Sequence, residues 1–333
     1  MFIDKENIVK KAFYIVMIGF LILSLSATFT PVMSQGVDEF VDFAVVSPLG
    51  AINTKLPDYT FAAVATATKY RVKVYTTASP DVPVYILKGS GNCSFPAGVC
   101  YLRPDLKLKV LDFYGKGYYF WTLEAKLNGV TWHMVFDHNE FQVYSQGFNS
   151  TFVTLNKWLN FKGTWSIVDP GYLKTKPPSG YYSSILHTHR FADDYVYEVM
   201  MKRKAEEAAP SFIIIQGQPD FETAGTDAWY SGLIFAYNNL GKCSVNYWKN
   251  HSIATYISWT SVNCNVVPYG WNKLTAYVSD GDVSLYVNDV LFQTIPDAIT
   301  NYASPTGYMG IGGLDDDSLL NALFVDYAKV YQP

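Results

Sequence analysis

The sequence predicts an all-β protein in which an antiparallel β-sandwich over residues 150–333 follows a smaller β-rich module and an N-terminal hydrophobic helix. Apolar and polar residues alternate with a period of two over residues 271–295, as they do in a strand with one buried face. Short polar breaks that tolerate tight turns recur between the apolar runs. No stretch of the C-terminal part that is long enough for a helix carries apolar residues at helical spacing. Two packed antiparallel sheets are therefore expected.

Length and composition favour an extracellular β protein. The chain has 333 residues, of which 49% are hydrophobic, so it can build one or two domains with buried cores. Its formal net charge is −4 and it has no long basic run, which excludes the electrostatic footprint of a nucleic-acid-binding protein. Aromatic residues make up 17% and charged residues only 16%, a balance typical of β-rich extracellular proteins.

The N-terminus, residues 1–34, carries the features of a secretory signal peptide. Lys5, Lys10 and Lys11 precede a long apolar run, and Ser34 supplies a small residue for cleavage. Export with cleavage near Ser34 is the favoured interpretation.

Two alternatives keep the hydrophobic segment on the protein. The apolar residues within 12–29 are only slightly fewer than the ~20 that a spanning helix needs, so an uncleaved membrane anchor is the first alternative. The second follows from a layout that resembles archaeal pilin-like precursors and implies cleavage after Ala12. All three interpretations place the protein outside the cell or on its surface.

The cysteines agree with export. Cys93 and Cys100 flank a short loop, and Cys243 and Cys264 lie on either side of a predicted hairpin. Local pairing within each half is the simplest of the three connectivities, and no cysteine belongs to a CxxC metal pattern.

Three glycosylation sequons give weaker support for an extracellular protein. They are expected in exposed turns and begin at Asn92, Asn149 and Asn250.

The first module, residues 36–147, reads as a series of strands separated by Gly, Pro, Asn and Asp. Asn128 and Gly129 form a strong hairpin signal between two of these runs. The module resembles no family that its residues identify. It is expected to be a spacer for the second module, with an adhesive or polymerising sandwich as the alternative.

The second module, residues 150–333, continues with strands up to its end. In the strand around Glu198, Tyr195, Tyr197 and their alternate neighbours share one face and Glu198 lies on the other. Further strand-like runs with regular turns follow over 211–217, 228–239, 242–249 and 252–259. Hairpin turns are then expected at residues 280–281 and 288–289.

The closing motifs of this module carry a family resemblance. They are WNKL at 271–274, DGD at 280–282, LYVND at 285–289, GYMGIGG at 307–313 and LFVDYAKV at 323–330. In this order they resemble the second half of a concanavalin A-like (laminin G-like) β-sandwich, a jelly roll. The GTW motif at 163–165 resembles the entry strand of the same superfamily.

The resemblance implies sugar binding or sugar cleavage, and the residues favour binding. Glucanases of this superfamily carry a Glu-x-Asp-x-(x)-Glu strand, since alternation then places a catalytic carboxylate pair on one face. That strand is missing, Glu198 is a lone strand carboxylate, and no GxSxG elbow exists. No catalytic residue is therefore assigned. The module also resembles keto-disaccharide hydrolases, which keeps a glycan-processing enzyme as an alternative.

Two groups of residues have the chemistry of metal ligands. His187 and His189 share a strand face but lack a third ligand, so a rim pair is the simpler interpretation. Asp315, Asp316 and Asp317 form an acidic loop whose oxygens suit Ca²⁺, with a solvated turn as the alternative. No cofactor other than Ca²⁺ is expected.

Aromatic residues give the best indication of a binding site. Trp248, Tyr256 and Tyr230 alternate away from neighbouring apolar residues and are expected on an open sheet face. Flat rings stack on the C–H faces of sugars, and Asn246 and Glu198 would add polar contacts. The alternative is that these rings pack in the core or against the first module.

The favoured function is therefore non-catalytic glycan binding or adhesion by a secreted or cell-surface protein. The expected partner is a glycan or a surface protein. A subunit of a surface filament or coat, assembled as a homo-oligomer, is the first alternative function, and a glycan-processing hydrolase is the second.

Overall fold

The computed structural model describes residues 45–333 apart from short gaps. The gaps are residues 53–54, 65, 90–91, 95–98, 105–106, 111, 113–115, 169–171, 177–181, 193, 205–206, 221–227 and 315–321. The expected signal or anchor at 1–34, including the apolar segment 12–29, lies outside the described residues. Within the described part, the regular elements are strands except for the short helix α2 (Ala298–Tyr302), which confirms the all-β prediction. None of the helices described there is long and apolar enough to cross a bilayer.

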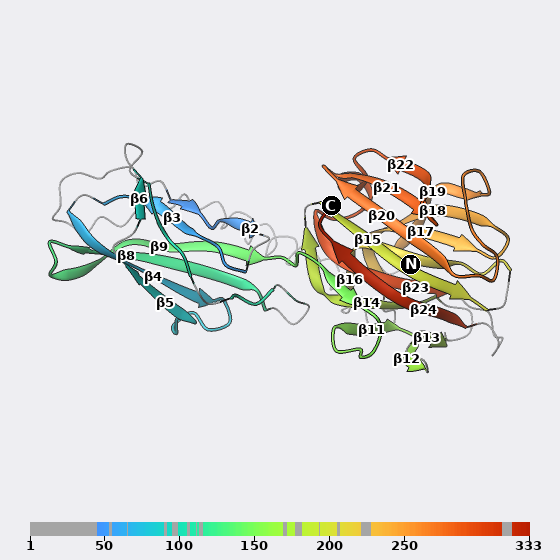
Figure 1. The fold of residues 1–333 in the computed structure, drawn as a ribbon, viewed down its shortest axis with the longest axis horizontal. Helices are drawn as coiled ribbons and strands as arrows, with labels where there is room; N and C mark the ends of the chain where they lie inside the picture. Colours follow the sequence, from blue (N-terminus) through green and yellow to red (C-terminus); the bar gives the residue numbers. More distant parts are fainter. Residues whose placement is uncertain are drawn as a thin grey trace, which may run out of the picture. The chain divides into compact units, whose positions relative to one another are not determined.

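The described strands before residue 147 form two sheets (Figure 1). The four-stranded sheet has the order β1 (Val45–Ser47), β3 (Tyr59–Ala62), β7 (Val99–Leu102) and β6 (Asn92–Ser94). The five-stranded sheet has the order β2 (Gly50–Ile52), β9 (Thr131–Val143), β8 (Tyr118–Leu127), β4 (Ala67–Thr76) and β5 (Tyr85–Gly89).

An aromatic core holds this module together. Tyr59 and Trp121 are fully buried, and their rings meet edge to face at 5.3 Å. The indole Nε1 of Trp121 donates to the Pro48 carbonyl at 3.0 Å, so the buried ring keeps no unpaired polar group. Asn128 and Gly129 form the predicted β8–β9 turn with positive φ at both residues.

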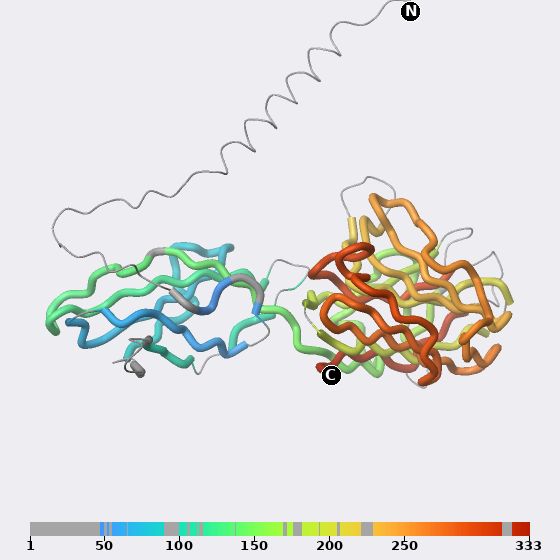
Figure 2. The backbone as a smooth tube through the Cα atoms, turned by 90° about the horizontal axis from the view of Figure 1, so that it is seen from above, coloured from blue at the N-terminus to red at the C-terminus, as the bar shows by residue number. Residues whose placement is uncertain are grey.

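The described strands after residue 147 form two larger antiparallel sheets. The eight-stranded sheet contains β12 (Thr164–Val168), β13 (Tyr172–Lys176), β24 (Leu323–Tyr331), β15 (Tyr195–Arg203), β20 (Asn272–Ser279), β21 (Asp282–Val287) and β22 (Val290–Ile295) in that order, with β10 (Phe148–Ser150) paired to β24. The seven-stranded sheet has the order β11 (Trp158–Lys162), β14 (Tyr182–Ala192), β23 (Thr306–Leu314), β16 (Ser211–Asp220), β17 (Ala228–Asn238), β18 (Lys242–Lys249) and β19 (Ser252–Thr260). The last strand returns beside earlier ones, and in Figure 2 the red and orange strands lie against the green and yellow strands of the same sandwich.

The two sheets pack through one hydrophobic core, as the alternation predicts. Tyr195 and Tyr197 of β15 face Leu233 and Phe235 of β17 in this core, and all four side chains are nearly or fully buried. Burying an apolar side chain of this size stabilises the fold by roughly 1.5–3 kcal/mol. The predicted antiparallel sandwich is therefore confirmed.

The predicted hairpin turns are also present. Asp280 and Gly281 connect β20 to β21 with φ values of 51° and 86°. Asn288 and Asp289 connect β21 to β22 with φ values of 49° and 66°. Two successive residues with positive φ match the twist of the flanking strands, which is why Gly, Asn and Asp mark these positions in the sequence.

Disulfide-bonded cysteines are present in both halves of the chain, as predicted. Cys243 and Cys264 form a disulfide with a Cα–Cα distance of 5.6 Å, which confirms that pairing. Cys93 and Cys100 lie opposite each other on β6 and β7, and Cys100 is disulfide-bonded.

The predicted modules meet between residues 147 and 150, where the chain forms a short strand. Residues 148–150 form β10 and pair with residues 328–330 of β24. Gly147 fits closely under this strand, since an added Cβ would lie 2.3 Å from the Val330 carbonyl oxygen. Residues 44–333 form one compact unit, so the independence of modules 36–147 and 150–333 stays a prediction.

Candidate ligand-binding face

The outer face of the seven-stranded sheet, which points away from the inter-sheet core, carries a second hydrophobic cluster. Along β18, Cys243 and Val245 face the core, whereas Trp248 belongs to the outer cluster. The Trp248 ring stacks on Trp229 with centroids 5.9 Å apart. The outer cluster consists of Phe161, Leu186, Phe212, Ile214, Trp229, Ile234, Ala236, Trp248 and Tyr308. Trp248 is therefore on the predicted face, but it is only 2% exposed and forms part of the packing.

A pocket of about 200 Å³ opens above this cluster, and we call it the aromatic pocket. Its base includes the buried Trp248, and Trp259 of the edge strand β19 lines it with 40% of its surface exposed. Among the described residues that line it, none is charged. The lining includes Tyr182, Phe212, Asn246, Trp248, Ile253 and Trp259. The pocket thus offers flat apolar surfaces and few polar groups.

Asn246 is the amide that faces the aromatic pocket, and its neighbours fix its orientation. Its Nδ2 donates to Ser244 Oγ at 3.1 Å, and its Oδ1 accepts from Thr255 Oγ1 at 2.9 Å. An amide whose orientation is fixed in advance can offer a directional hydrogen bond to a ligand without first losing rotamer freedom. Its expected position on the binding face is therefore consistent with the structure.

Tyr256 does not reach the aromatic pocket, because the strand pairing is irregular beside it. Thr255 pairs with Asn246 and Ile257 pairs with Val245, so Tyr256 is the extra residue of a β-bulge. Its ring lies 5.1 Å from Tyr302, which packs against the inter-sheet core. The simple alternation that grouped Tyr256 with Trp248 fails at this bulge.

Tyr230 and Glu198 also lie outside the aromatic pocket. Tyr230 is 48% exposed and its ring contacts His251, 5.2 Å away between centroids. Glu198 belongs to β15 of the eight-stranded sheet, on the face opposite Tyr197. The predicted set therefore divides into Trp248 and Asn246 at the pocket and three residues elsewhere.

The surroundings of Glu198 make it an ion-pairing residue. Its carboxylate lies 2.8 Å from Lys329 Nζ and 3.5 Å from Lys273 Nζ. Burial raises the pKa of Glu198, but hydrogen bonds from Lys329 and Tyr331 and the charges of both lysines outweigh it, so the pKa lies below its ordinary value. A carboxyl group held ionised in this way is unsuited to act as a general acid.

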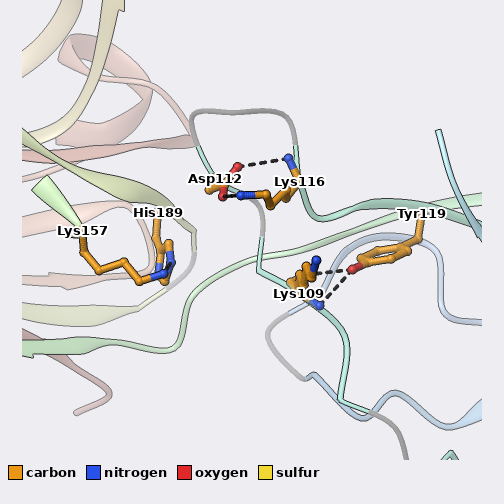
Figure 3. Close-up of polar contacts among 6 residues, drawn as sticks. All are labelled: Lys109, Asp112, Lys116, Tyr119, Lys157 and His189. Carbon is orange, nitrogen blue, oxygen red and sulfur yellow. Dashed lines mark hydrogen bonds and ion pairs between the residues drawn. The ribbon is translucent and has the colours of Figure 1, made fainter. Parts of the chain in front are cut away.

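His187 and His189 both contact other side chains of the protein. His187 is 2% exposed, and its ring stacks on Phe148 at 4.0 Å. His189 accepts a hydrogen bond from Lys157 Nζ at 3.3 Å (Figure 3). Burial, the neighbouring His189 and the charge of Lys157 hold the pKa of His187 far below its usual range, and burial with nearby Lys157 and Lys55 lowers the pKa of His189 to about 4. Both rings are therefore neutral at physiological pH.

The remaining predicted sites are the metal ligands and the glycosylation sequons. Within the described residues, no three His, Cys, Asp or Glu side chains gather in a way that could hold a metal ion. The acidic loop of Asp315, Asp316 and Asp317 lies outside the described residues.

Asn250 is exposed in the β18–β19 turn, as expected for a glycosylation site. Asn149 is exposed but lies on β10, and Asn92 lies on β6, so these two sequons are in strands.

Sequence reasoning missed Trp259 and Tyr182. Trp259 was visible in the same strand-like run as Tyr256, but its face depends on the bulge that precedes it. Tyr182 stands at the start of β14, and its ring lies 5.7 Å from that of Trp248. β14, which carries Tyr182, and β18, which carries Trp248, are not neighbours in the sheet. No local feature of the sequence therefore predicts that these two rings meet.

No protein-family model matches the sequence, and no curated protein matches it. Several solved structures are similar to part of the chain. A carbohydrate-binding module, CBM66 from Bacillus subtilis, is 14% identical over 52% of this chain and 94% of its own, with a TM-score of 0.40. A β-glucanase from Bacillus licheniformis is 15% identical over 57% and 99%, with a TM-score of 0.42. The exoplasmic/lumenal domain of VIP36, solved with Ca²⁺ and Man3GlcNAc bound, is 14% identical over 56% and 88%, with a TM-score of 0.41.

Proposed function

We propose that this chain is a secreted or cell-surface protein that binds a glycan without cleaving it. The observation that carries the proposal is the aromatic pocket, in which the exposed Trp259 lies beside a base that contains Trp248. Flat aromatic rings bury the C–H face of a sugar ring with little loss of side-chain entropy. The disulfide between Cys243 and Cys264 supports an oxidising, extracellular location.

The lining of the aromatic pocket also supports a neutral ligand. The described lining residues carry no charge, so they themselves offer a carboxylated or sulfated sugar no ion pair in exchange for its lost hydration. Asn246 supplies a fixed amide, which would accept or donate one hydrogen bond to a sugar hydroxyl.

Binding is favoured over hydrolysis because the described pocket lining lacks a carboxylate pair. Glycoside hydrolysis generally requires two carboxyl groups on either side of the scissile bond. Glu198, the carboxylate singled out from the sequence, is in the other sheet and is ion-paired with two lysines.

A glycan array combined with a reducing-sugar assay tests this proposal. We expect the purified protein to bind at least one family of neutral glycans and to release no reducing sugar from them. Release of reducing sugar would move the protein to the hydrolase alternative. An array without any bound glycan would contradict the proposal outright.

Assembly into a filament or coat is the second candidate function, and the edge of the seven-stranded sheet favours it. Among the described strands, β19 pairs only with β18; Ile253 on this strand is 57% exposed, and Val262 in the turn after it is 68% exposed. An unpaired strand edge can add a strand from another molecule. Light scattering over a concentration series distinguishes the two candidates, since assembly predicts a molecular mass that increases with concentration.

A further inference from the structure

One face of the five-stranded sheet in the first module concentrates positive charge. Tyr70 on β4 and Trp121 on β8 contact rings of the four-stranded sheet, so the residues that alternate with them point to the opposite face. Basic side chains of the described residues gather on that opposite face, which we call the basic face: Lys69, Arg71 and Lys73 on β4, Lys88 on β5 and Lys126 on β8. The whole chain has a formal net charge of −4, so this positive charge is a local feature. We propose that the basic face binds an acidic polysaccharide, a glycan whose sugars carry carboxylate or sulfate groups.

Strand pairing places like charges directly opposite each other on the basic face. Arg71 on β4 is paired with Lys88 on β5, and Lys69 on β4 is paired with Lys126 on β8. The Cβ atoms of directly opposite residues are about 4.5–5.5 Å apart, and like charges at such positions destabilise a sheet. The free protein therefore carries two unfavourable cross-strand pairs, and a bound anion would remove their repulsion.

Acidic side chains balance only part of this charge. The Glu124 carboxylate lies between Arg71 and Lys73 and forms an ion pair with each, at 2.7 Å for Lys73 Nζ. Glu140, further along the same face on β9, contacts His138 at 3.0 Å. Within the described part of the chain, the cations of the basic face that form no ion pair are Lys69, Lys88 and Lys126. These three lysines are the positions where anions of a ligand would bind.

Trp132 adds a flat apolar surface to the basic face. It lies on β9 directly opposite Lys126, and the centroid of its ring is 4.4 Å from Arg71 Cζ. The Trp132 ring and the Glu124 carboxylate together fix the Arg71 guanidinium before a ligand arrives. A fixed cation beside a flat ring suits an acidic sugar, which combines a C–H face with a charged group.

An anionic membrane has similar chemistry, but the extracellular location favours the polysaccharide. Cys100 of the same module is disulfide-bonded, as expected in an oxidising compartment. The negative surface potential of a cell membrane arises mainly from anionic lipids of its cytoplasmic leaflet. The inference therefore rests on the extracellular location in the proposed function. It uses no residue of the aromatic pocket, so the chain would hold a neutral and an acidic glycan at separate sites.

Binding of the full-length protein to immobilised polymers tests the proposal. The acidic probes are alginate, a polyuronate, and dextran sulfate; uncharged dextran is the neutral control, and phosphatidylglycerol vesicles are the lipid probe. We expect binding to at least one acidic polymer, more tightly than to the vesicles, and no binding to dextran. The affinity should fall about tenfold or more between about 50 and 300 mM NaCl, because salt weakens contacts between exposed charges.

A double variant locates the site. Lys69→Gln combined with Lys88→Gln removes one charge from each like-charge pair. The affinity for the acidic polymer should fall about tenfold or more, while the Tm stays level or rises because the repulsion is gone. The matched control combines Lys107→Gln with Lys109→Gln, which removes the same charge from two exposed lysines of the module outside the five-stranded sheet. This control should bind like the wild type.

Absence of binding to both acidic polymers, or binding to the vesicles that is equally tight or tighter, would overturn the proposal. So would a double variant that binds like the wild type or a control that loses as much affinity. A double variant that loses both affinity and thermal stability would assign these lysines to the fold and not to a ligand. Failure here is distinguishable from failure of the proposed function, because neutral glycans are measured separately on the array.

Discussion

At the scale of single residues, the same residue type takes different roles on neighbouring strands. Trp248 is packed between Trp229 and Tyr182, whereas Trp259 leaves 40% of its surface to solvent. The sequence places Trp248 on the correct face, because Val245 and Trp248 differ by an odd number of positions along one strand. It does not show that the outer face is itself packed, since this depends on rings from β14, β16 and β17.

The ion pairs of Glu198 are expected to stabilise the fold in a pH-dependent way. Its folded-state pKa is lowered by Lys329, Tyr331 and Lys273, so its ion pairs stabilise the fold above the ordinary carboxyl pKa and are lost as the pH falls through the folded value. Glu198→Gln should therefore reduce the free energy of unfolding by about 1–3 kcal/mol at pH 7. The difference between wild type and variant should shrink towards pH 3.

Urea unfolding at both pH values measures this. A difference that stays constant with pH would mean that the carboxylate charge of Glu198 is not what stabilises the fold.

At the scale of secondary-structure elements, alternation predicts strands and turns but fails at irregular pairing. The turn at Asp280 and Gly281 could be located from residue types alone. The β-bulge at Tyr256 could not, because nothing in the local pattern marks an extra residue. Glu198 was grouped with Trp248 for a related reason: which sheet a strand joins is decided by long-range pairing, and a period of two does not encode it.

Cysteine pairing is a second feature at the scale of elements. Cys243 is paired with Cys264, and Cys93 is expected to pair with Cys100. Cys243 and Cys264 are 21 residues apart, so on the chain-entropy model their bond stabilises the fold by about 3 kcal/mol. The shorter Cys93 to Cys100 loop should give roughly 2–3 kcal/mol on the same model. Mass spectrometry of a non-reduced digest should recover these two pairs alone, and a Cys93 to Cys243 link or free thiols throughout would refute local pairing.

At the scale of the whole molecule, the all-β class and the C-terminal sandwich follow from the sequence, while the exact start of the sandwich does not. β10 contains only three residues, Phe148, Asn149 and Ser150, and it pairs with the end of the chain. A strand of three residues has no periodicity that the sequence could show.

The sandwich is expected to fold alone, provided that β10 is included. A fragment of residues 146–333 should unfold cooperatively in urea, and a fragment of residues 152–333 should be less stable because it lacks β10 on β24. Equal stability of the two fragments would show that β10 adds nothing, and an insoluble longer fragment would show that the sandwich depends on the first module.

The central claim is that Trp259 and the surface around it bind a glycan. The most direct measurement is the affinity of Trp259→Ala for the strongest glycan on the array, with Tyr230→Ala as a control on the same sheet outside the pocket. Trp248→Ala is unsuitable for this purpose, since removing a buried Trp costs about 3–5 kcal/mol of folding free energy. We predict that Trp259→Ala keeps the wild-type fold and loses at least about tenfold in affinity, or about 1.4 kcal/mol, while Tyr230→Ala binds like the wild type. A folded Trp259→Ala protein with wild-type affinity would contradict the claim.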